Sequence, residues 1–303
     1  MRAVVVNAFG GPEVVEVVET ARPEPAAGEV RIKVAAATLN PVDAGVRSGL
    51  FGGGDGPVGL GWDVAGTVES ADAAGVWNVG DEVVALAPGL MRPLGAHAEY
   101  VVVDTGAVAP APAGVDAVRA ATLPLNALTA AQALDLLDLE EGRTLLVTGA
   151  AGAVGGFAVQ LAAHRGIAVT GLAREDDEEL VRSLGAASFT TVEALEGEGG
   201  GALPRADAVL DAAVLGERAL AWVRDGGAYA GVIPQAHPAP VRGVRTAAVA
   251  VTADGSRLAE LVRLVEEGVL TLRVAETFAL ADAAKAHARL AEGGVRGRLV
   301  LVP

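Results

Sequence analysis

The sequence predicts an α/β protein with a doubly wound parallel sheet next to a mainly antiparallel β region. Three observations carry this prediction. Residues 1–110 alternate short β-like runs with Gly and Pro. From about residue 115 onward, strand-like and helix-like segments alternate, which is typical of βαβ units. The length of 303 residues allows one large domain or two ordinary ones.

The expected strands of the first region are short, rich in Val and Ala, and bounded by turn-forming residues. They are Ala3–Val6, Val14–Val18, Val30–Ala36, Asp63–Val68, Glu82–Leu86 and Glu99–Val103. Strands of this length and spacing pair with their neighbours through turns, so we expect a folded-over antiparallel sheet.

The second region begins with helices at Ala117–Leu125, where Asp116 can act as N-cap, and at Thr129–Leu137. The expected strands that follow are Thr144–Thr148, Ile167–Ala173, Ala208–Asp211, Ala228–Ile233 and Thr246–Val251, and the helices between them are Ala153–Arg165, Asp177–Leu184 and Arg257–Glu267. The tail adds a strand at Arg273–Phe278, a helix at Ala281–Leu290 and a strand at Arg298–Val302. The stretch Glu196–Pro204 is a Gly-rich acidic loop in which the sequence pattern places no element.

The composition restricts the chemistry. A formal net charge of −15 makes nucleic acid a poor partner, because proteins that bind the phosphate backbone of nucleic acids carry basic surfaces. The absence of Cys excludes disulfides, thiolate nucleophiles, cysteine-bound zinc and iron–sulfur clusters, and it fits the cytoplasm. With four His and two Lys, few groups titrate near neutrality, so we expect a cofactor to carry the reaction. We expect no export signal and no membrane span, since glycines interrupt the longest uncharged stretch, Thr144–Ala163.

The strongest local signal is a glycine turn, Val147 to Gly156 (VTGAAGAVGG), between an apolar strand and a helix. A pyrophosphate needs close approach to the backbone, and the helix N-terminus offers it N–H groups. Gly149, Gly152 and Gly155 meet that need, although their spacing is GxxGxxG and not GxGxxG. A tight strand–helix turn also requires glycine for purely structural reasons, and this alternative stays open.

The end of the second strand favours one cofactor over the other. A carboxylate there accepts a hydrogen bond from a ribose 2′-hydroxyl, whereas an arginine pairs with a 2′-phosphate. The chain has Arg174 at this position and no acid at the strand tip, which favours NADP(H) over NAD(H). The acids of Glu175–Glu179 that follow are simply explained as the negative first turn of the next helix.

Several short motifs spread over nearly the whole chain make a specific pattern together. They are Phe9–Val14 (FGGPEV), Leu39–Asp43 (LNPVD), Arg47–Gly49, Gly61–Val68 (GWDVAGTV), Val79–Val83 (VGDEV), Ala98–Tyr100, Leu128–Ala130, the glycine turn, Leu184–Ala186 and Val295–Arg298. The pattern resembles the medium-chain dehydrogenase/reductase superfamily, in its zinc-independent NADPH:quinone oxidoreductase branch. The resemblance implies a Rossmann doubly wound parallel sheet inserted in a GroES-like, mainly antiparallel β domain. The GroES-like domain would comprise residues 1–118, completed by residues 270–303, and the Rossmann domain residues 119–269, with the active site in the cleft between them.

The resemblance also predicts that no metal is bound. In zinc-dependent relatives, ligands lie near the segment equivalent to Leu39–Asp43 and at a Gly-His-Glu that aligns with Gly61-Trp62-Asp63. Here Trp62 replaces the histidine, and the chain has no cysteine to complete a zinc site. Trp62 is then expected to fill the metal space or to stack on substrate.

The resemblance assigns catalytic positions to Asn40, Asp43, Arg47 and Trp62. Asn40 would lie near the nicotinamide or the substrate carbonyl, while turn chemistry before Pro41 is an equal alternative. Asp43 could instead pair with Arg47 or cap a helical turn. The expected cofactor contacts are Asn40, Thr129, Gly149, Ala151, Gly152, Val154, Gly155, Arg174, Ala212, Gly231, Val232, Ile233 and Arg296. A bond from the Thr129 hydroxyl back to its helix and a surface role for Arg296 remain open.

The expected reaction is hydride transfer from NADPH to a quinone or a small α,β-unsaturated carbonyl. Related enoyl-thioester reductases carry a Tyr proton donor where this chain has Phe51, so protonation would come from water, which suits quinones. An enone, alkenal or enoyl-thioester reductase and a non-enzymatic NADPH-binding redox sensor stay as alternatives. The apolar segment Arg245–Val251 is an expected edge strand, through which a homodimer would form.

Overall fold

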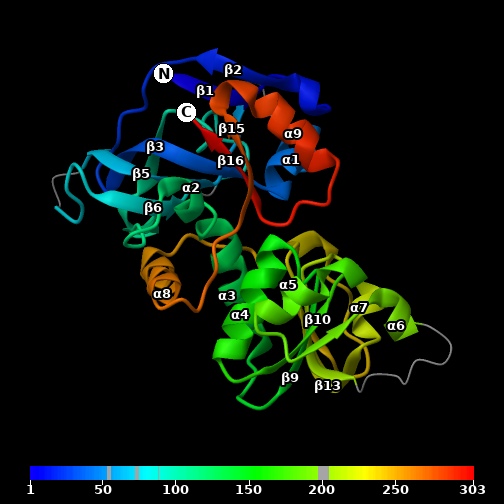
Figure 1. Cartoon of the computed structure of the whole chain (residues 1–303). Helices are drawn as coiled ribbons and strands as arrows, with labels where there is room; N and C mark the ends of the chain where they lie inside the picture. Colours follow the sequence, from blue (N-terminus) through cyan, green and yellow to red (C-terminus); the bar gives the residue numbers. More distant parts are fainter. Residues whose placement is uncertain (53–55, 72–74, 88, 197–204) are drawn as a thin grey trace. The chain divides into compact units, whose positions relative to one another are not determined.

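The computed structural model describes residues 1–52, 56–71, 75–87, 89–196 and 205–303. The chain divides into two compact units, drawn in Figure 1. Unit 1 comprises Met1–Leu125, Thr252–Glu266 and Leu272–Pro303, and unit 2 comprises Asn126–Val251 and Glu267–Thr271. The domain bounds from the sequence, 1–118 with 270–303 against 119–269, stay a prediction, because a compact unit need not be a domain that folds alone.

The two divisions differ most at helix α8 (Gly255–Glu266), which the sequence assigned to the Rossmann domain and which lies in unit 1. The helix begins directly against the backbone of the first region: a Cβ on Gly255 would lie 2.4 Å from the carbonyl oxygen of Val108. Near the other end of α8, Oε1 of Glu266 accepts a hydrogen bond of 2.8 Å from the backbone N–H of Ala113.

Unit 1 is built on two sheets. The larger has the strand order β15-β16-β3-β5-β6-β8, with β7 also paired to β3, and the smaller has the order β2-β1-β4. The strands are β1 (Arg2–Val6), β2 (Val15–Glu19), β3 (Glu29–Leu39), β4 (Val58–Gly59), β5 (Asp63–Ser70), β6 (Glu82–Leu86), β7 (Tyr100–Asp104), β8 (Val108–Pro110), β15 (Val274–Ala279) and β16 (Arg298–Val302). All pairs are antiparallel except β15 with β16. The last strand, β16, pairs with β3 in the register Leu299↔Leu39, so the C-terminal segment completes the N-terminal sheet.

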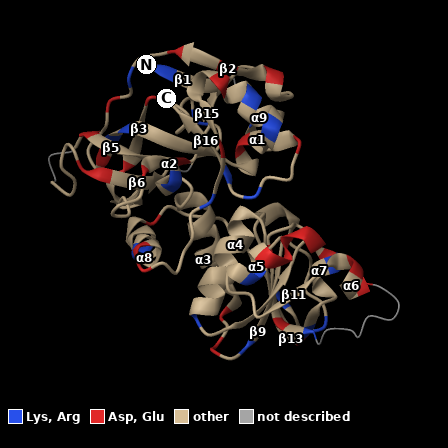
Figure 2. Ribbon diagram, in the orientation of Figure 1, with Lys and Arg blue, Asp and Glu red and all other residues tan. Residues whose placement is uncertain are grey.

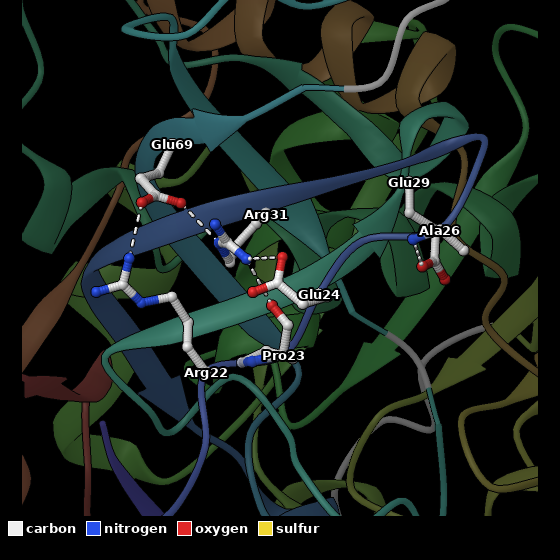
Figure 3. Close-up of polar contacts among 7 residues, drawn as sticks. All are labelled: Arg22, Pro23, Glu24, Ala26, Glu29, Arg31 and Glu69. Carbon is white, nitrogen blue, oxygen red and sulfur yellow. Dashed lines mark hydrogen bonds and ion pairs between the residues drawn. The ribbon is translucent and has the colours of Figure 1, made fainter.

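An ion-pair network fixes the segment that leads into β3 (Figure 3). Arg31 in β3 is only 8% exposed, and it donates through Nε to Glu69 at 2.6 Å and through Nη1 to Glu24 at 2.8 Å and to the carbonyl of Pro23 at 2.9 Å. Arg22 donates to the other oxygen of Glu69 at 2.9 Å and lies 4.1 Å above the ring of Tyr100. The guanidinium of Arg31 is thereby satisfied where it is withdrawn from water.

The helices of unit 1 are α1 (Pro41–Ser48), α2 (Ala117–Ala120), α8 and α9 (Ala283–Ala291). The sequence predicted one helix over Ala117–Leu125, but α2 ends at Ala120 and Pro124 begins the next helix, α3 (Pro124–Leu137). Proline fits a first helical position because its missing N–H would have no partner there. Helix α1 was not predicted as a helix at all.

Unit 2 contains a sheet with the strand order β11-β10-β9-β12-β13-β14 in which every pair is parallel. Its strands are β9 (Thr144–Thr148), β10 (Ala168–Leu172), β11 (Ser188–Thr190), β12 (Ala206–Asp211), β13 (Val223–Gly231) and β14 (Arg245–Ala248). Its helices after α3 are α4 (Ala153–His164), α5 (Glu178–Ser183), α6 (Val192–Glu196) and α7 (Glu217–Leu220). In order of appearance the strands run 3-2-1-4-5-6, which is the doubly wound Rossmann order. The predicted fold class is therefore confirmed.

The strand order reverses between β9 and β12, and such a reversal is where open α/β sheets bind ligands. The predicted strand β9 has the observed bounds, whereas β11, a three-residue strand, was missed. Apart from Glu196, the last residue of α6, the stretch 196–204 lies outside the described residues. None of the helices that the structure describes combines the length and the apolar character needed to cross a bilayer.

Candidate active site

Asn40 and Asp43 begin helix α1 of unit 1. Asn40 is the N-cap residue in extended conformation, and Pro41 occupies the first helical position. Asp43 Oδ2 accepts the backbone N–H of Asn40 at 2.8 Å, and its Oδ1 accepts the N–H of Gly61 at 2.7 Å. Both carboxylate oxygens of Asp43 therefore accept hydrogen bonds from backbone N–H groups. Asp43 thus caps the helix and does not pair with Arg47. Burial raises the pKa of Asp43, opposed by His97 and by the two backbone donors.

Asp63, at the start of β5, joins the Asn40 side chain to the rest of unit 1. Its Oδ2 accepts hydrogen bonds from Asn40 Nδ2 at 2.6 Å and from the Thr38 hydroxyl, and its Oδ1 accepts the N–H of Leu125 at 2.6 Å. Burial raises the pKa of Asp63 to about 6 against the pull of these donors and of Arg298. The sequence did not predict Asp63 as a site residue. The feature that could have indicated it is an acidic residue at the start of an apolar strand.

The other catalytic positions expected in unit 1 differ in surroundings. Arg47, in the last turn of α1, is mostly buried, and within the described part of the chain its Nε and Nη1 atoms have no hydrogen-bond partner. Burial lowers the pKa of Arg47. Trp62 is half-buried, and Arg296, an expected cofactor contact, lies half-buried just before β16 in the same unit.

The histidines of the described residues have separate surroundings. His97 is buried and its Nε2 lies 2.8 Å from the carbonyl oxygen of Thr38, while burial lowers the pKa of His287 to about 3. His237 is exposed, and its Nδ1 lies 2.7 Å from the carbonyl oxygen of Pro234. Among the described residues, no group of three His, Cys, Asp or Glu side chains could hold a metal ion.

The glycine turn of unit 2 connects β9 to α4. Gly149 has φ +61°, a left-handed conformation that favours glycine, and its carbonyl accepts the N–H of Gly152 at 2.8 Å. A Cβ on Gly155 would lie 2.2 Å from the Gly149 carbonyl oxygen, so Gly155 is required by packing within the turn. Among the described residues outside its chain neighbours, a Cβ on Gly152 would meet that oxygen alone, at 3.0 Å. Packing within the turn therefore explains the glycine at position 155 without any ligand. At position 152 the missing side chain instead leaves room beside the start of α4.

A buried polar network crosses the switch point between β9 and β12. Thr148, the last residue of β9, donates its hydroxyl to Asp211 Oδ1 at 2.6 Å and accepts the N–H of Ala213 at 3.0 Å. Asp211 Oδ2 accepts the N–H of Gly216 and the hydroxyl of Tyr229, each at 2.8 Å. The network ties the strand before the glycine turn to the loop after β12. Sequence reasoning missed it, although an acid ending an apolar strand was its visible sign.

The expected cofactor contacts of unit 2 gather at the carboxyl edge of its sheet. Residues at the ends of β9, β10, β12 and β13 or in the following turns are Gly149, Ala151, Gly152, Val154, Gly155, Arg174, Ala212, Gly231, Val232 and Ile233. Arg174 is exposed just beyond β10, and across the described ranges it makes no ion pair. The acidic residues that follow it, Glu175–Glu179, lead into and begin α5, where Figure 2 colours the ribbon red. Thr129 is buried on α3, apart from these strand ends in the chain. Asn40, Asp43, Arg47, Trp62 and Arg296 belong to unit 1.

A Rossmann sheet with a glycine turn at its switch point, in the same chain as a completed antiparallel β unit, is typical of dinucleotide-dependent oxidoreductases. Two family profiles match: the alcohol dehydrogenase GroES-like domain over residues 26–113 and the zinc-binding dehydrogenase over residues 184–301. The chain is 34% identical over 318 residues to the chloroplastic NADPH-dependent alkenal/one oxidoreductase of Arabidopsis thaliana, covering 100% of this chain and 80% of the relative. It is 32% identical over 323 residues to the quinone oxidoreductase of Pseudomonas aeruginosa, covering 98% of each.

Solved structures of related enzymes have the same fold over the whole chain. The quinone oxidoreductase from Coxiella burnetii superposes with a TM-score of 0.86 at 28% identity, over 100% of this chain and 99% of that one. An NAD-dependent alcohol dehydrogenase (TM-score 0.85, 32% identity) and a mycobacterial protein complexed with NADPH (0.85, 28%) each match over 100% of both chains. The chain belongs to the medium-chain dehydrogenase/reductase superfamily, in its zinc-independent quinone oxidoreductase branch, as the motifs predicted.

Proposed function

We propose that the protein is an NADPH-dependent, zinc-independent oxidoreductase that reduces quinones. The observation that carries the proposal is the carboxyl edge of the unit 2 sheet, where the glycine turn lies at the switch point and Arg174 stands exposed beyond the next strand. The open side of Gly152 fits a pyrophosphate and Arg174 fits a 2′-phosphate. The curated relatives include one named NADPH-dependent and one named quinone oxidoreductase.

The chain's own residues would bind and orient the reactants. When NADPH is bound, its nicotinamide supplies the hydride. In the proposal, the Asn40 carboxamide orients the nicotinamide or the carbonyl of the acceptor, and Thr129 contacts the nicotinamide half of the cofactor. Phe51 offers no ionisable hydroxyl, so the proton added to the reduced acceptor comes from water. The donor set does not fit the zinc site of the zinc-dependent relatives, because the chain lacks cysteine and Trp62 stands where their histidine ligand would be.

The acceptor class is tested by following NADPH oxidation on addition of a 1,4-quinone and, separately, of a small enone. We expect oxidation with the quinone to exceed that with the enone by about tenfold or more, because no tyrosine proton donor stands at Phe51. Faster turnover with the enone would favour the alternative of an alkenal or enone reductase, which the name of the Arabidopsis thaliana relative supports. Cofactor binding without turnover of either acceptor would favour a redox sensor.

Cofactor preference is tested at Arg174. We expect Arg174→Ala to weaken NADPH binding by about 10- to 100-fold, because a charge-assisted hydrogen bond is worth about 1.5–3 kcal/mol. NADH, which has no 2′-phosphate, should bind the variant and the wild type equally. The matched control is Arg182→Ala on α5, whose guanidinium pairs with Glu178 at 2.7 Å. An unchanged NADPH affinity in Arg174→Ala would move the 2′-phosphate site elsewhere.

The proposal includes a homodimer and a cytoplasmic location. The dimer would form at β14, which ends the strand order of the unit 2 sheet and lies within the expected segment Arg245–Val251. A sedimentation experiment that finds a monomer at micromolar concentration would contradict the dimer. The acidic, cysteine-free composition supports the cytoplasmic location.

A further inference from the structure

The hydroxyl of Thr148 and the carboxylate of Asp211 form a buried pair between the neighbouring strands β9 and β12 of unit 2. The two residues lie opposite each other in the sheet register, and both are 0% exposed. Thr148 Oγ1 donates to Asp211 Oδ1 at 2.6 Å, and Asp211 Oδ2 accepts from the Gly216 N–H and the Tyr229 hydroxyl. A carboxylate this deep in a protein is costly unless donors reach both of its oxygens, so these contacts depend on one another.

The pair holds the loop after β12 at two points. Thr148 Oγ1 accepts the backbone N–H of Ala213 at 3.0 Å, and Asp211 Oδ2 accepts that of Gly216 at 2.8 Å. Between these two contacts, Val214 has φ +57°, a left-handed conformation that a β-branched residue rarely adopts. Such strain persists where the surrounding contacts over-determine the backbone, and it concentrates at ligand sites. The two hydrogen bonds to the loop provide that constraint.

This loop of residues 212–216, the β12 loop, lies directly against the glycine turn. A Cβ on Gly149 would lie 3.3 Å from the backbone nitrogen and from the Cβ of Ala213, and 3.4 Å from the carbonyl carbon of Ala212. The strand order reverses between the two strands that these segments follow, and a dinucleotide binds at such a reversal. Val214 is 43% exposed, so the constrained loop presents an apolar side chain there.

The position of the β12 loop determines which half of a dinucleotide it would meet. A dinucleotide at this edge places one nucleotide on each side of the reversal. Arg174 follows β10, so the nucleotide that carries the 2′-phosphate lies on the side of β10 and β11. The nicotinamide nucleotide then lies on the side of β12 and β13, next to the β12 loop.

We propose that Thr148 and Asp211 are positioning residues for the cofactor: their hydrogen-bonded pair fixes the β12 loop as the wall against which the nicotinamide nucleotide binds. This inference rests on the proposed function for the identity of the cofactor. Neither residue touches the nucleotide in the proposal, since both are fully buried. They act through the backbone N–H groups of Ala213 and Gly216.

The test compares two ligands by isothermal titration calorimetry. One is NADPH, and the other is adenosine 2′,5′-bisphosphate, which keeps the 2′-phosphate nucleotide and lacks the nicotinamide nucleotide. Thr148→Val keeps the shape of the side chain but removes the acceptor for the Ala213 N–H and the donor to Asp211. We expect its dissociation constant for NADPH to rise about tenfold. The dissociation constant for the bisphosphate should change by less than about twofold, because that ligand does not reach the β12 loop.

The same strand supplies a matched control at its other end. The Thr144 hydroxyl donates to the carboxylate of Asp207 at 2.8 Å and accepts the backbone N–H of Asp207 at 2.9 Å. Thr144→Val therefore removes the same two kinds of hydrogen bond, but at the amino edge of the sheet, and both dissociation constants should stay unchanged. Thr148→Ser keeps the hydroxyl and should bind NADPH as the wild type does.

A measurement on the wild type keeps the test decisive if Thr148→Val does not fold. We expect NADPH to slow the hydrogen–deuterium exchange of the backbone N–H groups in the β12 loop, because the nicotinamide nucleotide covers them. The bisphosphate should leave their exchange unchanged. Exchange in the β12 loop that does not respond to NADPH would overturn the proposal.

The wild-type affinities distinguish a failure of this inference from a failure of the proposed function. If the wild type binds neither ligand, the proposed cofactor site is wrong and the positioning role is wrong with it. If the wild type binds both ligands, the cofactor site stands. In that case, a folded Thr148→Val that loses affinity for neither ligand, or for both equally, would overturn the positioning role alone.

Discussion

Replacing Gly152 by valine is expected to abolish detectable NADPH binding and to leave the protein folded. Gly152 is the N-cap of α4 with φ −72° and ψ 179°, an extended conformation that any residue adopts. In the part of the chain that the structure describes, its added Cβ would meet one atom beyond its chain neighbours, the Gly149 carbonyl oxygen at 3.0 Å. The valine methyls would then occupy the room that a pyrophosphate needs at the start of α4. We expect the dissociation constant for NADPH to rise by more than about 100-fold, since each lost phosphate contact is worth about 1.5–3 kcal/mol.

Gly155→Ala, three residues further, is the matched contrast. Its methyl group would lie 2.2 Å from the Gly149 carbonyl oxygen and 2.7 Å from the carbonyl carbon, so the backbone must shift. We expect the free energy of unfolding in urea to fall by about 3 kcal/mol, against about 1 kcal/mol for Gly152→Val as a poorer N-cap. We expect Gly152→Val to bind NADPH weakly with little loss of stability, and Gly155→Ala to be much less stable. This result would separate the binding role of the turn from its packing role. Normal NADPH affinity in Gly152→Val would contradict the binding role.

Arg298→Met is expected to have the largest effect on stability in unit 1. Arg298 is 6% exposed and donates through Nη2 to the Leu39 carbonyl at 2.8 Å, and its charge favours the ionised forms of Asp43 and Asp63. Its removal leaves both carboxylates buried without this cation, which should cost about 3–5 kcal/mol near neutral pH. The control is Arg289→Met on α9, whose pair with Glu276 is partly exposed and should contribute at most about 1 kcal/mol.

The destabilisation caused by Arg298→Met should decrease as pH falls. The pKa of Asp63 is raised in the folded state, so between its unfolded value and about 6 the folded protein binds more protons than the unfolded one. Its contribution to stability is therefore largest at low pH and is lost as pH rises through about 6. Protonation also relieves the unpaired carboxylates of Arg298→Met, so the destabilisation should shrink as pH falls from about 7.5 to about 5. A loss of stability that is equal at both pH values in urea unfolding would contradict this account.

Periodicity and turn residues predicted the parts of the fold that depend on local sequence. The strands Glu82–Leu86, Thr144–Thr148 and Arg298–Val302 have the predicted bounds, because each begins at a polar residue and continues as a short apolar run. Strand β11 was missed because its three residues carry too little pattern. Helix α1 was missed because Asn-Pro and Gly45 look like a turn. One oxygen of Asp43 caps the helix at Asn40, but the other finds its donor only at Gly61, 18 residues away.

The candidate site residues that lie in one continuous segment could be predicted from the sequence. The residues whose role depends on tertiary contacts could not. The glycine turn and Arg174 are adjacent to predicted strand ends, so sequence alone placed them. Asp63 and Asp211 depend on partners 62 and 63 residues away, Leu125 and Thr148, and no spacing in the sequence reveals such pairs. In both cases the visible sign was a single acid at one end of an apolar strand, where an unsatisfied charge would be costly.

The most direct test of the central claim is a paired titration of the purified protein with NADPH and with NADH, followed by fluorescence of the reduced nicotinamide. The account predicts saturable binding of both, with NADPH tighter by about 10- to 100-fold because Arg174 meets only the 2′-phosphate of NADPH. Equal affinities would contradict the assignment of Arg174, and the absence of binding by either nucleotide would contradict the cofactor site at the glycine turn.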